Sequence, residues 1–162
     1  MRVVLALVLL CAVSLASPAR AQEAASSSLR ETISAKLQEL ITAANAGDAE
    51  AFFALTSGSP ELVLVGDGRI MRGQDEIRAN LKDLFVEHER YRWVFGTPEV
   101  ITAGSGVAIA ITPYQFTAAG DASAVQLSGA FSVVFARNWF WQDWKVVHSH
   151  RSTGKIGVAI AD

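Results

Sequence analysis

Apolar residues recur at the spacing of an amphipathic helix in three segments of the first half of the chain. The first predicted helix begins at Ser28, which forms a capping box with Glu31, and ends at Gly47. Asp48 is placed to cap a short second helix. A third helix follows residues 66–68 and has acidic residues in its first turn. The apolar positions of the three helices are Leu29, Ile33, Leu37, Leu40, Ile41 and Ala44; Ala51, Phe52 and Leu55; and Ile77, Leu81, Leu84 and Phe85.

The pattern changes to that of β-strands after residue 90. Four runs rich in β-branched and aromatic residues lie at about 91–101, 106–117, 124–137 and 139–150, and turn-like segments separate them. A shorter strand is predicted at 61–65, before the turn at 66–68. Short connections between successive strands favour an antiparallel meander. The sequence therefore predicts an α+β domain in which helices cover one face of a curved sheet.

The N-terminus has the pattern of a secretory signal peptide. Arg2 is followed by an apolar run over residues 3–16 and by small residues that end at Ala21, after which cleavage is expected. The apolar run is shorter than the roughly 20 residues of a membrane-spanning helix. We therefore expect a signal peptide at 1–21, a flexible lead-in at 22–28, one domain at 29–154 and a C-terminal tail at 155–162. The expected location is periplasmic or secreted.

Net charge and cysteine content limit the classes of binding partner and the kinds of chemistry that we expect of the mature chain. The net charge is −2, and loss of residues 1–21 removes two arginines and no acid, which leaves −4. Nucleic acids and anionic membranes are poor partners for such a chain, because both attract clustered basic residues. Cys11, the one cysteine, lies in the signal peptide. The mature chain then has no disulfide, cysteine nucleophile or cysteine metal ligand.

The terminal stretch WKVVHSHRS, residues 144–152, combines polar residues at strand-like spacing. In a regular strand, side chains two residues apart share a face. The residues Trp144, Val146, His148, His150 and Ser152 would then lie on one face, and Lys145, Val147, Ser149 and Arg151 on the other. If the histidine face lines a pocket, Trp144 joins it; if the arginine face does, Ser149 joins it. The sequence leaves this choice open.

The order of elements, the NAGD at 45–48, the RG at 72–73 and the closing WKVVHSHRS resemble the SnoaL-like branch of the nuclear transport factor 2-like superfamily. The closing motif is also similar to that of the calcium/calmodulin-dependent protein kinase II association domain. The resemblance implies a cystatin-like cone, with three N-terminal helices packed on a curved, mainly antiparallel sheet and a pocket at the open end. It also implies a homodimer formed through the outer sheet face.

Two groups within the superfamily allow a comparison by position. Steroid-isomerase relatives carry a catalytic tyrosine and aspartate at positions that match Leu40 and Leu64, and neither leucine can transfer a proton. In the kinase-associated relatives several arginines line the pocket. Arg151 matches the arginine of the closing motif, but Ala110 stands where another is expected.

The histidines allow three interpretations. His88, His148 and His150 have the ligand types of a zinc site, but we expect no metal and no cofactor, because His88 lies where a histidine commonly stabilises a helix end. His148 or His150 is the candidate general base of a catalytic site. The structural alternative is that both hold the strand end by hydrogen bonds.

The remaining candidates are ligand-binding residues. Arg151 offers a planar donor group for an anion, or else an ion pair with a glutamate or aspartate at a subunit edge. The other candidates are polar or aromatic residues suited to line a cone: Tyr114, Trp144, Ser149, Phe53 and Trp93. The first hypothesis is a domain that binds a small, largely apolar organic molecule. The alternatives are an isomerase, lyase or cyclase that uses a pocket histidine, and a dimeric assembly or interaction module.

Overall fold

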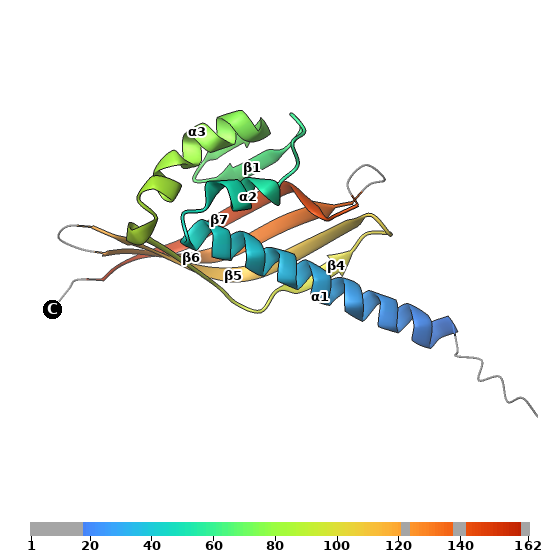
Figure 1. The fold of residues 1–162 in the computed structure, drawn as a ribbon. Helices are drawn as coiled ribbons and strands as arrows, with labels where there is room; N and C mark the ends of the chain where they lie inside the picture. Colours follow the sequence, from blue (N-terminus) through green and yellow to red (C-terminus); the bar gives the residue numbers. More distant parts are fainter. Residues whose placement is uncertain (1–17, 121–123, 138–141, 160–162) are drawn as a thin grey trace, which may run out of the picture.

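The computed structural model describes residues 18–120, 124–137 and 142–159, with side chains described from Ser26 to Gly154 within these ranges. The chain folds as helices packed on one sheet (Figure 1). The elements are α1 (Pro18–Asn45), α2 (Ala49–Ala54), β1 (Val63–Gly66), β2 (Arg69–Arg72), α3 (Gly73–Val86), η1 (His88–Arg90), β3 (Tyr91–Phe95), β4 (Glu99–Thr102), β5 (Val107–Ala119), β6 (Ala124–Ala136) and β7 (Lys145–Ala159).

The sheet has seven strands in the order β2-β1-β7-β6-β5-β3, with β4 also paired to β5. All pairs are antiparallel except β1 with β7, which is parallel. The three α-helices lie on one face of this sheet, as Figure 1 shows. The predicted α+β architecture, with helices on one face of a mainly antiparallel sheet, is therefore confirmed.

Three element boundaries differ from the sequence prediction. The helix α1 begins at Pro18 instead of Ser28, so residues 22–28 are helical and Ser28 is no helix start. The predicted run 91–101 is two strands, β3 and β4, separated by Gly96-Thr97-Pro98, because proline and glycine interrupt a strand. The last strand, β7, extends to Ala159, beyond the end of the predicted run at residue 150.

The NAGD segment forms a tight joint between α1 and α2. Gly47 has a φ of +70°, the left-handed conformation that ends many helices, and a Cβ placed there would lie 2.8 Å from the Phe85 carbonyl oxygen. The Asp48 side chain accepts a hydrogen bond of 2.9 Å from Ala51 N–H, which caps α2 as predicted. The side chain of Asn45 reaches the edge strand β3 instead.

A two-residue turn joins β1 to β2. Asp67 and Gly68 have φ angles of +53° and +73°, the conformation of a type I′ turn, for which Asp-Gly is a preferred sequence. The sequence analysis recognised the turn but missed β2, whose four residues do not alternate clearly between apolar and polar. The hairpin places Asp67 at the end of β1, one strand away from β7.

A β-bulge interrupts β7 in the middle of its polar motif. Val134 pairs with His148 and Phe135 pairs with Val146, which leaves Val147 as an extra residue in β7. Beyond the bulge, Ser149 and Arg151 lie opposite Val133 and Phe131. The extra residue reverses the alternation of faces, so the regular alternation predicted for residues 144–152 is wrong.

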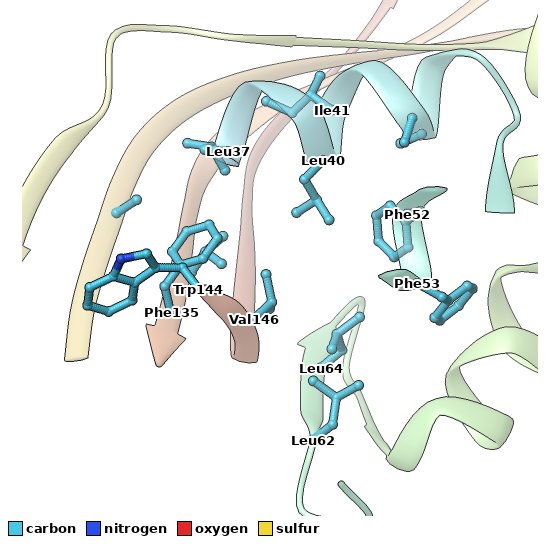
Figure 2. Packing of buried hydrophobic residues seen from close by; sticks show 14 of the residues in the cluster. Leu37, Leu40, Ile41, Phe52, Phe53, Leu62, Leu64, Phe135, Trp144 and Val146 are labelled. Carbon is cyan, nitrogen blue, oxygen red and sulfur yellow. The ribbon is translucent and has the colours of Figure 1, made fainter. Parts of the chain in front are cut away.

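The core lies between the helices and the inner sheet face. The α1 stripe packs with α2, β1 and the sheet in one cluster, and Figure 2 shows Leu40 pointing from α1 towards Val146. Trp144 is buried in this cluster, and the Arg137 guanidinium lies 5.0 Å from the centre of its ring. Trp139, Phe140 and Trp141, which begin the last predicted run, lie outside the described residues.

Candidate functional site

A cavity of about 140 Å³ lies between α1 and the inner face of the sheet. Apolar side chains form most of its wall: Leu40, Ile41, Ala44, Phe52, Leu64, Val65, Met71, Leu81, Leu84, Trp93, Phe95, Phe131 and Val146. Four polar side chains complete the lining, namely Thr56, Asp67, Ser149 and Arg151. The cavity is therefore an apolar chamber with a small polar part.

The β7 bulge brings Ser149 and Arg151 to the cavity. Both residues follow the extra residue Val147, and both line the chamber together with Val146. Ser149 is 5 % exposed, and within the described part of the chain its hydroxyl has no hydrogen-bond partner. The sequence left open which face of residues 144–152 lines a pocket. In the structure it is the face that carries Ser149 and Arg151.

Arg151 forms an ion pair with Asp67 across the β1–β7 edge. Its Nη2 donates to a carboxylate oxygen of Asp67; the Arg151 side chain is 17 % exposed and that of Asp67 is 57 % exposed. Burial lowers the pKa of the Arg151 guanidinium, because removal from water disfavours its positive charge. The Asp67 carboxylate offsets this cost. Of the two sequence interpretations of Arg151, the ion pair is present, and it is an intrachain pair at the cavity wall.

Trp93 connects Arg151 to the opposite side of the cone. The strands β5 and β6 lie between β3 and β7. In a flat sheet, β3 and β7 would therefore be about 14 Å apart. The Arg151 Cζ nevertheless lies 5.2 Å from the centre of the Trp93 ring. The curvature of the sheet and the length of the two side chains make this cation–π contact possible.

Asn45 fixes the backbone at Trp93. Its Nδ2 donates to the Trp93 carbonyl oxygen at 2.9 Å, and its Oδ1 accepts from the Trp93 N–H at 2.8 Å. Asn45, at the end of α1, therefore fixes the position of Trp93, a cavity residue of β3. The indole Nε1 of Trp93 is buried and has no hydrogen-bond partner in the described chain. An unpaired buried donor costs about 1–3 kcal/mol.

Tyr114, Phe53 and Trp144, which were predicted to bind a ligand, lie near the cavity but do not line it. Tyr114 is buried against Trp93, and its hydroxyl lies 3.0 Å from Thr153 Oγ1. The Phe53 ring packs between helices, with the Arg78 guanidinium 4.1 Å from its centre. These three aromatic side chains pack behind the residues that line the cavity.

The histidines do not meet in the structure. His148 pairs with Val134 and His150 with Ser132, and neither lines the cavity. His150 is exposed on the face opposite to the helices. The Nδ1 of His88 lies 3.3 Å from the Phe85 carbonyl oxygen in the last turn of α3, which is the helix-end role considered from the sequence. Among the described residues no three His, Cys, Asp or Glu side chains form a metal-binding group.

Asp67 is the charged cavity residue that was not predicted from the sequence. A carboxylate in a glycine-flanked turn usually points into water, and nothing local signals that β1 lies beside β7. By contrast, Leu40 and Leu64, matched by position to the steroid-isomerase catalytic pair, both line the cavity. The cavity thus carries leucines at the two positions that the sequence resemblance matches to proton-transfer groups.

Comparison with known families and structures agrees with this architecture. The family model of the SnoaL-like domain matches residues 33–155, and the chain belongs to this family. No curated protein matches the chain. Within the described residues, no helix is long and apolar enough to cross a membrane.

Solved structures share the nuclear transport factor 2-like fold. A superfamily protein from Salmonella enterica serovar Typhimurium has a TM-score of 0.69 at 20% identity, over 80% of this chain and 94% of its own. A protein with a cystatin-like fold from Novosphingobium aromaticivorans has a TM-score of 0.67 at 17% identity, over 85% and 90%. The CaMKII hub of S. rosetta has a TM-score of 0.63 at 20% identity, over 76% and 95%. At these identities the similarity establishes the fold and no activity.

Proposed function

We infer that the protein binds a small, largely apolar organic molecule in the cavity of the cone. The observation that carries this proposal is the lining: apolar side chains make most of the wall, and Ser149 and Arg151 supply polar groups. Ligand sites commonly combine an apolar wall with a few polar groups that orient the ligand.

The lining favours binding over proton transfer. Leu40 and Leu64 occupy the positions of the steroid-isomerase catalytic pair, and Asp67 is paired with Arg151. An isomerase, lyase or cyclase with His148 or His150 as general base is the weaker proposal, because neither imidazole lines the cavity. For a reaction at these histidines the substrate would have to bind on the outer sheet face.

Two features beyond the cavity belong to the same proposal. The signal-peptide pattern of residues 1–21 supports export to the periplasm or the medium, with Gln22 as the first residue of the mature chain. The sheet face opposite the helices carries exposed apolar side chains, among them Val94 and Ile101, which supports a homodimer formed through that face. A dimer of this kind is also what the alternative hypothesis, a dimeric assembly or interaction module, requires.

Native mass spectrometry of the protein purified from its own compartment tests the binding proposal. We expect an adduct of one organic molecule per chain that is lost under denaturing conditions. Ala44→Phe places a ring in the cavity and should abolish the adduct, whereas Ala51→Phe makes the same change at an exposed position of α2 and should retain it. An adduct that survives equally in Ala44→Phe would refute binding in this cavity.

A further inference from the structure

We propose that Asp67 sets the charge of the ligand: it occupies Arg151, so that the cavity selects an uncharged molecule whose polar end is a hydrogen-bond acceptor. This inference rests on the proposed binding function and specifies its ligand class. The Ser149 hydroxyl and the N–H groups of Arg151 that Asp67 does not occupy are the donors that hold the acceptor.

The charges in the cavity wall cancel. Asp67 and Arg151 are the two ionisable side chains among the described lining residues, and they form an ion pair. A carboxylate ligand at Arg151 would have to displace Asp67, or share one guanidinium with it. Two carboxylates at close range in a partly buried site repel each other strongly. An uncharged ligand leaves the ion pair intact.

The polar groups of the wall favour donation to a ligand. Asp67 is paired with Nη2 of Arg151, and the other N–H groups of a guanidinium can only donate. The Ser149 hydroxyl, which lines the cavity, can donate or accept. By contrast, the Thr56 hydroxyl donates to the Phe53 carbonyl oxygen and accepts from Gln74. The wall therefore favours a carbonyl oxygen over a group that must donate.

The size of the cavity limits the body of the ligand. Its volume is about 140 Å³. An engineered apolar cavity of about 150 Å³ in another protein holds one benzene molecule. The ligand class is therefore a single-ring compound with an uncharged carbonyl group, such as an aromatic aldehyde, ketone or amide.

A matched pair of probes tests the charge preference. Benzamide and benzoate have nearly the same size and shape and differ in charge, and their dissociation constants are measured by calorimetric titration at pH 7. We expect the full chain to bind benzamide at least about tenfold more tightly than benzoate. In Asp67→Asn the order should reverse, because Arg151 then lacks its carboxylate partner. Asparagine tolerates the φ of +53° at this turn, so the hairpin should persist.

Two further variants separate the roles of the wall residues. Ser149→Ala removes a hydroxyl donor from the wall, and should weaken benzamide binding without a gain for benzoate. Asp75→Asn removes an exposed carboxylate from the first turn of α3, away from the cavity, and should leave both affinities unchanged.

The inference is overturned if the unmodified chain binds benzoate as tightly as benzamide, or if Asp67→Asn leaves their ratio unchanged. It is also overturned if neither probe binds either protein. The proposed function is judged separately by the native mass spectrum and its Ala44→Phe comparison. An adduct in that spectrum without a charge preference in the titrations would refute the role of Asp67 alone.

Discussion

The two hydrogen bonds between Asn45 and the backbone of Trp93 are the link between the α1–α2 joint and the cavity wall. We predict that Asn45→Ala lowers the free energy of unfolding by about 1–3 kcal/mol, because it leaves a part-buried N–H and a carbonyl oxygen of β3 unpaired. Urea denaturation measures this loss. Gln38→Ala, which removes an exposed side-chain hydrogen bond from the same helix, should cost less than about 0.5 kcal/mol. Equal losses in the two variants would contradict the role assigned to Asn45.

At the level of single residues, the sequence predicted part of the cavity wall. Arg151, Ser149 and Trp93 were candidates, and all three line the cavity. Asp67 was missed, because its contact with Arg151 depends on the parallel pairing of β1 with β7, which joins segments more than 80 residues apart. Turn chemistry predicted the bend at Asp67 but carried no information about its neighbour.

The joint between α1 and α2 depends on Gly47, whose conformation and close contacts both exclude a side chain. We predict that Gly47→Ala costs more than about 3 kcal/mol, since the added Cβ would meet His88 and the Phe85 carbonyl oxygen in addition to the left-handed strain. Gly104→Ala is the matched control: its φ is +76°, but nothing lies within 4 Å of the added Cβ. Chemical denaturation should therefore give about 1–2 kcal/mol for Gly104→Ala. A Gly47→Ala loss no larger than this would show that the close contact is unimportant.

The bulge in β7 decides which side chains face the cavity, and cysteine labelling can locate it. In a Cys11→Ser background, we predict that Val146→Cys and Ser149→Cys react slowly with a thiol reagent and that His150→Cys reacts fast. A regular strand would place residues 146 and 150 on the same face and residue 149 on the other. Similar labelling rates at 146 and 150, with 149 different, would contradict the bulge.

Among the elements, local sequence patterns predicted the helices and the long strands. They did not predict the short strand β2 or the register of β7 against β6. The strand β2 has four residues without clear alternation, and it is specified by its hairpin partner and by α3, which follows it directly. The bulge at Val147 depends on how β6 and β7 fit against the core, with Phe135 and Val146 both buried. Sequence periodicity assumes regular pairing, and so it predicted the wrong set of side chains on the inner face.

For the whole molecule, the uncovered sheet face leads to a prediction about assembly. Val94 and Ile101 are 48% and 44% exposed, and Ile101 pairs with Ile109 on the face away from the helices. We predict a homodimer in solution that Ile101→Asp converts to monomer, because a buried unpaired charge opposes association. Ile70→Asp changes a similarly exposed isoleucine on β2, at the opposite edge of the sheet, and should leave the dimer intact. Sedimentation velocity distinguishes the states, and a monomeric unmodified protein would contradict the prediction.

The central claim is that the cone binds a small apolar molecule, and a titration with toluene followed by ligand-observed NMR tests it most directly. We predict saturable binding of one toluene per chain to the unmodified protein and to Ala51→Phe, and no binding to Ala44→Phe, whose added ring occupies the cavity. Absence of saturable binding to the unmodified protein, or equal binding to all three proteins, would contradict the claim.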